Sequence, residues 1–414
     1  MTGDDTNDAS VTFADVEAAR ERLDDPSVVK PTPTERSTAL ESKTGAEAVT
    51  LKLEHLQWTG SFKTRGAYNK IKRELEAGTL DQVVAASAGN HAQGVALAAT
   101  TLGVESTIVM PKTAPQTKID ATRGYGATVE LVGQDFQAAT AHAKELVAES
   151  DAEFVHAFDD PAIVAGQGTL GLEMVEDVPD ADTVVVPIGG GGLISGIATA
   201  FAEHSPETRI VGVQAEGAAT VHDSLAKGEP RTLDSVDTIA DGIATGGISE
   251  LTLSVIEEHV DEVVTVTDAE IADAILLLME RAKQVVEGAG AASVAALLSG
   301  ELDVTDENVL ALLCGGNLDM TMLMEVVIHA MTRRRQILRL RIHIDDRPGK
   351  MEHISGIIAD HGGNIQTVRH DRGIMDLNVG EAYLVFEVET SGAEQAAAIV
   401  DGIAEQGYDV DIVS

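Results

Sequence analysis

The sequence is poor in basic residues and nearly lacks cysteine. Its 414 residues include 29 Lys and Arg against 68 Asp and Glu, a formal net charge of −39. Nucleic-acid phosphates and anionic lipids would repel such a chain, so we expect no nucleic-acid partner and no membrane binding. The acidic residues are spread along the chain, which resembles proteins of salt-loving (halophilic) organisms, where carboxylates maintain solubility. The charge therefore reports on the solvent and not on the chemistry.

The single cysteine, Cys314, excludes a disulfide framework and a multi-thiolate metal site. Because the polar, acidic first residues match neither a signal nor a transit peptide, we expect a cytoplasmic protein. Residues 183–202 carry no charge, but Pro187 and a run of four glycines predict a buried strand, a glycine loop and a helix there, not a membrane span. The 12 histidines show no metal-ligand spacing, so we expect no metal site.

Short apolar runs alternate with longer helical patterns over most of the chain. This order is typical of βαβ units and predicts an α/β fold with mostly parallel sheets. A helix is expected first, at residues 13–23, and a later one starts at Thr267, which forms a capping box with Glu270. The predicted strands are residues 82–86, 106–110, 128–132, 183–187 and 210–214.

The pattern changes near residue 335. Residues 338–345 alternate apolar and polar side chains, as a half-buried strand does, and Pro348 suits the first turn of a helix that Gly362 and Gly363 end. Two further strands, a helix and a last strand follow, which completes a βαββαβ ferredoxin-like order. The sequence therefore predicts two domains, residues 1–335 and 336–414. The later elements are expected at residues 365–369, 382–390, 393–405 and 409–413.

Three segments of the α/β body carry candidate site residues. One is Lys63, where a helix should begin; another is the turn of Ser87, Ala88, Gly89, Asn90 and His91; the third is Gly189, Gly190, Gly191, Gly192 and Leu193. The second and third segments each follow an apolar strand and open a helix, where backbone N–H groups bind carboxylates or phosphates. Taken singly, the lysine also fits a solvated surface residue and the second segment an ordinary helix cap.

The glycine run also raises the alternative of dinucleotide binding. Its closest G-x-G-x-x-G register, Gly190, Gly192 and Ser195, lacks the third glycine, although Glu216 stands at the distance of a ribose-binding acid. Pyridoxal phosphate suits the combination better, because it requires an anion site, an amine and a partner for its ring oxygen.

Four segments share their sequence and order with a known family. They read LKLEHLQWTGSFKTRGAYNKI at residues 51–71, SAGNHAQG at 87–94, GGGGL at 189–193 and CGGN at 314–317. In this order they resemble the threonine ammonia-lyase (threonine dehydratase) family of fold-type II pyridoxal phosphate enzymes. The resemblance implies two open parallel-sheet subdomains. It also implies pyridoxal 5′-phosphate as cofactor and conversion of L-threonine to 2-oxobutanoate and ammonia by β-elimination, the first step toward isoleucine.

The resemblance implies a role for each candidate residue. Lys63 corresponds to the lysine that forms the Schiff base and moves the Cα proton, and Asn90 to the partner of the cofactor's 3′ oxygen. Residues 189–193 correspond to the phosphate loop, and residues 87–91 to the turn that binds the substrate carboxylate. Cys314 stands where the family places a neutral partner of the pyridine nitrogen; it also fits a buried apolar thiol.

Other positions are less defined by the resemblance. Glu287 corresponds to a segment that lines the pocket, and it equally fits a structural carboxylate. Related racemases bind a cation with an acid at the position of Glu216 and a second acid shortly after it. Here Thr220 and His222 occupy that stretch, which argues against a metal site.

Residues 344–365, IDDRPGKMEHISGIIADHGGNI, resemble the ACT domain, a ferredoxin-like unit that binds amino acids beside its first strand and helix. The resemblance implies allosteric control by an amino acid such as isoleucine; the alternative is a surface that only dimerises. It also implies a homotetramer or homodimer.

Two other functions stay open. A serine dehydratase or serine racemase of the same fold differs by the recognition of one methyl group, which contributes only about 1–3 kcal/mol. An amino-acid sensor with a vestigial enzyme body is the other alternative, and the intact Lys63, Asn90 and glycine loop argue against it.

Overall fold

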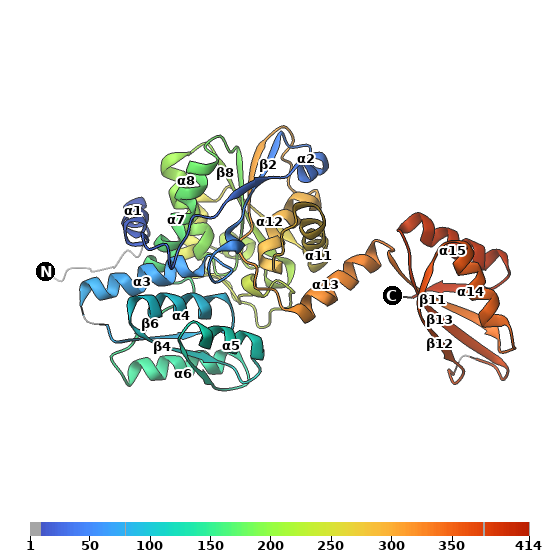
Figure 1. Cartoon of the computed structure of the whole chain (residues 1–414). Coiled ribbons are helices and arrows are strands. Elements are labelled where there is room, and N and C mark those ends of the chain that lie inside the picture. The colour runs from blue at the N-terminus through green and yellow to red at the C-terminus, as the bar shows by residue number, and fades with distance from the viewer. Residues whose placement is uncertain (1–9, 79, 376, 414) are drawn as a thin grey trace. The chain divides into compact units, whose positions relative to one another are not determined.

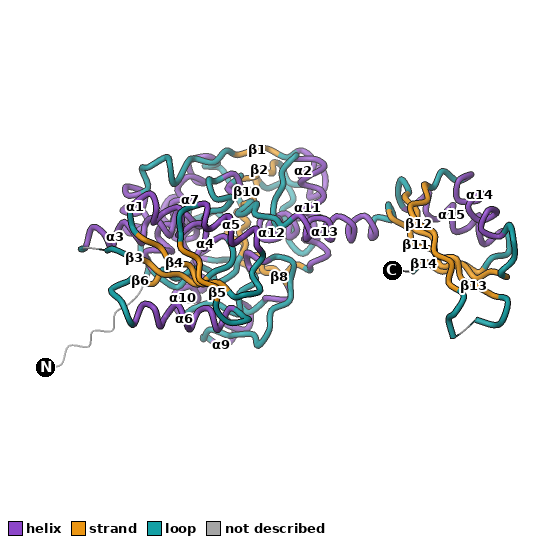
Figure 2. Tube along the Cα trace, turned by 60° about the horizontal axis from the view of Figure 1, so that its bottom comes forward, coloured by secondary structure: helices purple, strands orange, loops and turns teal. Residues whose placement is uncertain are grey.

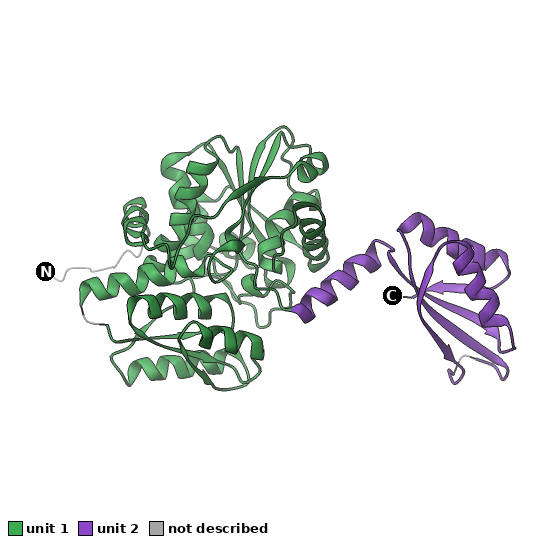
Figure 3. Ribbon diagram, viewed as in Figure 1, with its two compact units in different colours: residues 1–319 green, residues 320–414 purple. Residues whose placement is uncertain are grey.

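The computed structural model describes residues 10–78, 80–375 and 377–413. Residues 1–9, on which the expectation of no targeting signal depends, lie outside the described residues. Contacts divide the chain between Asp319 and Met320 into two units (Figure 3). This division lies before the predicted boundary at 335 and 336, because helix α13 (Met320–Arg333) contacts strand β11 (Ile337–Asp345) of the second unit.

The first unit contains two sheets (Figure 1). All neighbouring strands are parallel except β1 and β2, so the two parallel-sheet subdomains are confirmed. The larger sheet has the order β1 (Thr34–Arg36), β2 (Ala48–Lys52), β10 (Asn308–Leu312), β7 (Thr183–Pro187), β8 (Arg209–Ala215) and β9 (Glu262–Val266). The smaller has the order β5 (Thr128–Leu131), β4 (Glu105–Met110), β3 (Gln82–Ala86) and β6 (Glu153–Phe154).

Helices cover both faces of the smaller sheet, which explains the continuous apolar run of its strand β3. Along β3, Val83 and Ala85 pack in one apolar cluster and Val84 and Ala86 in another, which includes buried alanines of helix α6 (Phe136–Ala148). Figure 2 shows α6 alongside these strands. The five strands predicted in this unit are all present, with ends within one residue of those expected.

The other helices of the first unit follow the sequence signals closely. The capping box at Thr267 is present and opens α11, and residues 183–202 form β7, the glycine loop and most of α8, as predicted. In the described part of the chain no helix combines the length and apolarity that a membrane crossing requires. The helices are α1 (Phe13–Arg22), α2 (Thr38–Thr44), α3 (Lys63–Ala77), α4 (Asn90–Leu102), α5 (Gln116–Gly124), α7 (Pro161–Asp177), α8 (Gly192–His204), α9 (Val221–Lys227), α10 (Glu250–His259), α11 (Asp268–Leu277) and α12 (Gly288–Ser299), with the shorter turns η1 (Glu54–Leu56), η2 (Glu216–Ala218), η3 (Asp241–Ile243) and η4 (Leu278–Ala282).

The second unit has the predicted βαββαβ order. Its antiparallel sheet has the order β12-β13-β11-β14, and buried aliphatic residues of the sheet and of both helices form its core. One detail is wrong: Pro348 precedes the helix instead of occupying its first turn, because Gly349 (φ 89°) intervenes as N-cap in a left-handed conformation. The elements are β11, α14 (Lys350–Asp360), β12 (Asn364–Asp371), β13 (Glu381–Glu389), α15 (Ala393–Glu405) and β14 (Asp409–Ile412).

Candidate active site

Lys63 is the first residue of α3, and its side chain enters a cavity. Its Nζ donates a hydrogen bond to the carbonyl of Ala157 at 2.9 Å and lies 5.0 Å from the ring centre of Phe62. Burial lowers the pKa of Lys63 to about 8, although Cys314 and Glu287 act in the opposite direction. Near neutral pH this amine is therefore much closer to its uncharged form than an ordinary lysine is.

The turn from Ser87 to His91 connects β3 to α4. The Ser87 hydroxyl accepts a hydrogen bond from the amide of Gly89 at 3.2 Å, and Asn90 is the first residue of the helix. The buried His91 ring bonds the carbonyl of Val155 through Nε2 at 2.9 Å. Burial, followed by the charge of Lys63, lowers the pKa of His91 to about 3, so the ring is neutral near pH 7.

The glycine loop connects β7 to α8, and two of its positions require glycine. Gly191 has φ 90°, and a Cβ on Gly190 would collide with the ring of Phe158. The loop is fixed from behind, because the Thr252 hydroxyl donates to the carbonyl of Gly190 at 2.9 Å. Its amide groups at the start of α8 are therefore held in a shape that suits an anion such as phosphate.

Cys314 follows β10 and is buried. Its thiol donates to the carbonyl of Ala289 at 3.4 Å, and burial raises its pKa well above the usual range. The side chain therefore stays a neutral thiol at any pH at which the protein functions.

All the site residues predicted from the sequence line one cavity of about 600 Å³. They come from helix starts and strand ends of both sheets, where open α/β sheets bind ligands. The set comprises Lys63, Ser87, Ala88, Gly89, Asn90, His91, Gly189, Gly190, Gly191, Gly192, Leu193 and Cys314. Their functional roles stay predictions, but the structure brings every one of them together.

The cavity also contains a carboxyl group to which the sequence assigned no clear role. Glu287 is buried at the N-cap of α12 and accepts a hydrogen bond from Asn90 Nδ2 at 2.6 Å. Burial raises the pKa of Glu287 to about 7, against the opposing hydrogen bond from Asn90. A carboxyl group that is half protonated near neutral pH is a marker of functional sites.

Asn317 was missed by sequence reasoning, although it is the last residue of the CGGN segment. Its Nδ2 donates to the carbonyl of Thr59 at 2.6 Å and to Asn90 Oδ1 at 2.8 Å. The motif marked the segment, but only the fold shows which residue the Asn317 amide contacts.

Charged side chains from α5 and η3 meet at the cavity lining. Lys118 Nζ lies 3.0 Å from Asp241 Oδ2, and both residues line the cavity. The side chain of Asp241 is 64% exposed and that of Lys118 is 21% exposed, so the pair is open to solvent on the side of Asp241. Among the described residues, no group of three His, Cys, Asp or Glu side chains has an arrangement that could hold a metal ion.

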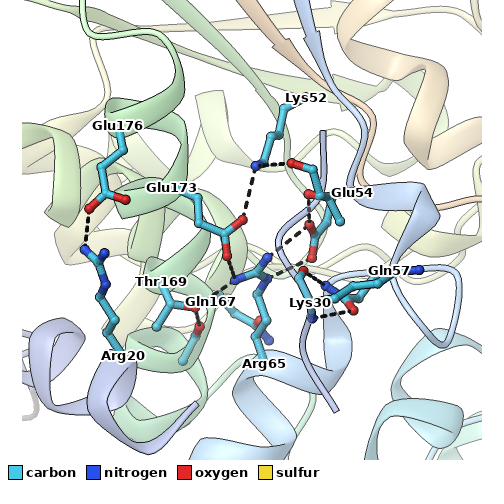
Figure 4. Close-up of polar contacts among 12 residues, drawn as sticks. Arg20, Lys30, Lys52, Glu54, Gln57, Arg65, Gln167, Thr169, Glu173 and Glu176 are labelled. Carbon is cyan, nitrogen blue, oxygen red and sulfur yellow. Dashed lines mark hydrogen bonds and ion pairs between the residues drawn. The ribbon is translucent and has the colours of Figure 1, made fainter. Parts of the chain in front are cut away.

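The start of α3 is held by a second group of charged side chains, which we call the Arg65 cluster: Lys52, Glu54, Arg65, Glu173 and Asp177, of which Figure 4 labels the first four. Arg65 lies 2.8 Å from Glu54 (Nε to Oε1) and 2.7 Å from Glu173 (Nη1 to Oε1). Lys52 Nζ lies 3.1 Å from Glu173 Oε2 and 2.8 Å from Asp177 Oδ2. The side chains of Arg65 and Lys52 are 1% exposed, so the carboxylates take the place of water around both cations, whereas Glu173 and Asp177 stay 24% and 36% exposed.

The cavity residues fit pyridoxal phosphate in three ways. An amine with a lowered pKa is available to bind an aldehyde, a glycine loop at a helix start can hold the phosphate, and Asn90 and Cys314 can face polar atoms of the ring. Residues 27–315 match the family described as pyridoxal-phosphate dependent enzyme. The chain belongs to this family.

The relatives of this pyridoxal-phosphate dependent enzyme are similar over most of its length. The L-threonine ammonia-lyase of Thermotoga maritima is 43% identical over 403 residues, which is 97% of this chain and 100% of the relative. Among solved structures, processed threonine deaminase isoform 2 from Solanum lycopersicum has a TM-score of 0.72 at 38% identity, covering 77% of this chain and 87% of its own. Maize serine racemase has a TM-score of 0.71 at 33% identity, covering 79% of this chain and 99% of its own.

Proposed function

We propose that this enzyme is a threonine ammonia-lyase that converts L-threonine to 2-oxobutanoate and ammonia. The observation that carries the proposal is the single cavity in which the amine of Lys63 faces two turns built to bind anions. The full-length similarity to a protein named L-threonine ammonia-lyase supports threonine as the substrate.

Each part of the cavity has a binding task in this proposal. Lys63 would hold the cofactor through its aldehyde carbon, residues 189–193 would bind the phosphate, and Asn90 and Cys314 would be the polar partners of the ring oxygen and the ring nitrogen. When bound, pyridoxal phosphate supplies an electron-withdrawing ring conjugated to the substrate nitrogen, which weakens the Cα–H bond and lets the β-hydroxyl leave. The thiol of Cys314 would offer the ring nitrogen a neutral partner instead of a charged one.

Lys63 also moves the proton. With substrate bound, the uncharged Nζ of Lys63 would accept the proton from Cα, and its lowered pKa would keep enough of the uncharged form present. The amides of the turn at residues 87–91 bind the substrate carboxylate, which orients Cα toward Lys63. The proton and the hydroxyl leave as water, and one water molecule then releases ammonia, so the overall reaction is balanced.

The test begins with the holoenzyme purified in high salt. We expect visible absorbance from the bound cofactor, and release of 2-oxobutanoate from threonine with a higher kcat/KM than release of pyruvate from serine. Lys63→Ala should lose both signals. Absence of the absorbance, or equal turnover by the variant, would exclude the enzyme and favour an amino-acid sensor.

A serine dehydratase or serine racemase is the second candidate, favoured by the similarity to maize serine racemase. Both alternatives use the same cavity, so only the substrate and the product distinguish them. A higher kcat/KM for serine would support the dehydratase, and D-serine formed from L-serine, resolved by chiral chromatography, would support the racemase.

We also propose that residues 336–414 form an ACT regulatory domain that binds an amino acid such as isoleucine and inhibits the body formed by residues 1–335. The βαββαβ order supports this assignment. The loop between β11 and α14 is held by an ion pair, in which Arg372 Nε lies 2.6 Å from Asp346 Oδ2. Asp346→Asn should raise the isoleucine concentration for half-inhibition without changing the uninhibited rate. No response of the natural sequence to any amino acid would reduce the domain to an assembly surface.

We propose in addition a cytoplasmic homotetramer or homodimer adapted to high salt. The free thiol of Cys314 supports the cytoplasm, the charge of −39 supports the adaptation to salt, and the resemblance of the sequence to the threonine ammonia-lyase family supports the oligomer. Light scattering at increasing KCl concentrations tests them: the oligomer should assemble and activity should rise as salt screens the acidic surface. A monomer at every salt concentration would exclude the assembly.

A further inference from the structure

The CGGN segment is joined to the chain that leads into Lys63. The amide of Gly316 donates to the carbonyl of Gly60 at 2.8 Å, and Ser61 and Gly315 form an isolated antiparallel bridge. Gly60 has φ 71°, and a side chain there would collide with the Asn317 amide. Asn317 is therefore packed between the loop before α3 and the start of α4, where its side chain has little freedom.

The hydrogen bonds of Asn317 have a direction that backbone atoms determine. A carbonyl oxygen only accepts, so the carbonyl of Thr59 selects the NH₂ end of the Asn317 amide. The second N–H of that NH₂ group then points to Asn90 and selects its oxygen, Oδ1. An amide whose oxygen is engaged on one side presents its nitrogen on the other, and Asn90 Nδ2 indeed donates to Glu287 Oε1.

We propose that Asn317 is a positioning residue that determines which end of the Asn90 amide faces Glu287 and the cofactor. With Asn317 in place, Asn90 offers N–H donors: one is used by Glu287, and the other is available to the ring oxygen of pyridoxal phosphate. Without this constraint, the amide could rotate and present an oxygen, which would oppose the ring oxygen. The inference rests on the proposed cofactor chemistry, but it concerns the cavity before any substrate binds.

The carboxyl group of Glu287 has a fixed place but no fixed hydrogen-bond direction. The backbone amide of Glu287 donates to the carbonyl of Gly315 at 3.1 Å, and a side chain on Gly315 would collide with Glu287 Oε1. A protonated Glu287 could donate as well as accept, so Glu287 alone does not determine the direction of its bond to Asn90. Asn317 does, because its own direction is fixed by a backbone carbonyl.

Two substitutions at residue 317 separate positioning from packing. Asn317→Asp keeps the shape but removes both donors, so the new carboxylate should attract Asn90 Nδ2 and turn its oxygen toward the cofactor. Asn317→Ala removes the side chain and leaves Asn90 free to adopt either orientation. We expect pyridoxal phosphate to dissociate about 10- to 100-fold more readily from the Asp variant. The Ala variant should show a smaller loss, and both should shift the absorbance of the bound cofactor and its pH titration.

A role in packing alone predicts the reverse order, with the isosteric Asp variant mild and the Ala variant severe. That order, or a cofactor affinity and absorbance unchanged in the Ala variant, would overturn the proposal. Circular dichroism and the unfolding midpoint identify a variant that fails to fold, and the Ala variant then decides alone.

In Asn317→Asp, the new carboxylate and Glu287 can both be negatively charged and repel each other. The double variant Asn317→Asp with Glu287→Gln removes this repulsion. It should recover stability but not cofactor affinity, and recovery of both would trace the loss to charge repulsion and reject positioning. Because cofactor binding is measured without substrate, inactivity toward threonine would reject the proposed function and leave this inference standing.

Discussion

Lys63 and Arg65 lie two residues apart at the start of α3, yet they belong to opposite kinds of buried environment. Burial alone would lower the pKa of Arg65, but Glu54 and Glu173 raise it above its usual range. Around Lys63 burial prevails: the pKa of the amine falls to about 8, and that of Glu287 rises to about 7. Arg65 therefore keeps its charge, whereas Lys63 and Glu287 are poised to change theirs near neutral pH.

The difference shows how to separate structural from functional buried charge. In the Arg65 cluster each cation contacts two carboxylates, and Arg65 and Lys52 outweigh the effect of burial on Glu173 to lower its pKa. Arg65 and Glu173 therefore favour their charged forms, and the role that their contact supports is to hold elements together. The amine of Lys63 has no carboxylate within salt-bridge distance among the described residues, and its hydrogen bond goes to a neutral carbonyl. A group that titrates near the working pH is what proton transfer requires.

The largest expected effect is the loss of activity in Lys63→Ala. Keto-acid release should fall at least about a thousandfold, because attachment of the cofactor and the Cα proton acceptor are lost together. The unfolding free energy of the apoprotein should stay within about 1 kcal/mol, because only one hydrogen bond to a carbonyl disappears. A loss of stability as large as that expected for Arg65 would contradict the distinction between the two environments.

The corresponding change in the Arg65 cluster should affect folding. Arg65→Met leaves Glu54, whose side chain is 0% exposed, without its cationic partner. We expect a loss of about 3–5 kcal/mol in the free energy of unfolding, measured by guanidinium denaturation. The matched double variant Arg65→Met with Glu54→Gln should recover part of that loss, since no unpaired charge remains. A cost below about 1 kcal/mol for the single variant would show that water reaches the cluster.

Local signals predicted most of the fold, and joint motifs selected residues that the structure brings to one cavity. Periodicity and turn residues were sufficient for strands such as β3 and β7, because their apolar runs are bounded by clear breakers. The role of Arg65 was not predictable, because its partners Glu54 and Glu173 lie on different elements and nothing local marks them as a pair. The same holds for Asn317, whose contacts depend on the junction of two distant segments.

The pH dependence of stability tests the cavity side of the comparison. Burial raises the pKa of Glu287 from 4.5 to about 7, so the folded apoprotein binds more protons than the unfolded chain between these values. Protonated Glu287 contributes about 3 kcal/mol to the free energy of unfolding. This contribution is fully present below pH 4.5 and is lost as pH rises through about 7. Glu287→Gln cannot titrate, so its unfolding free energy relative to the natural sequence should increase over this range. A difference that is constant with pH would show that Glu287 is already ionised.

The smallest expected effect concerns the pair of Lys118 and Asp241, which lines the cavity but is open to solvent. An exposed pair contributes little, so Asp241→Asn should raise the KM for threonine by no more than about fivefold at low salt and not at all at high salt. Glu229→Gln is a matched control, because its side chain is also 64% exposed in an ion pair with Arg231 but lies away from the cavity lining. The control should leave KM unchanged at every salt concentration. If instead Asp241→Asn lowers kcat equally at low and high salt, the pair belongs with the cavity groups, and solvent exposure does not separate structural from functional charge in this protein.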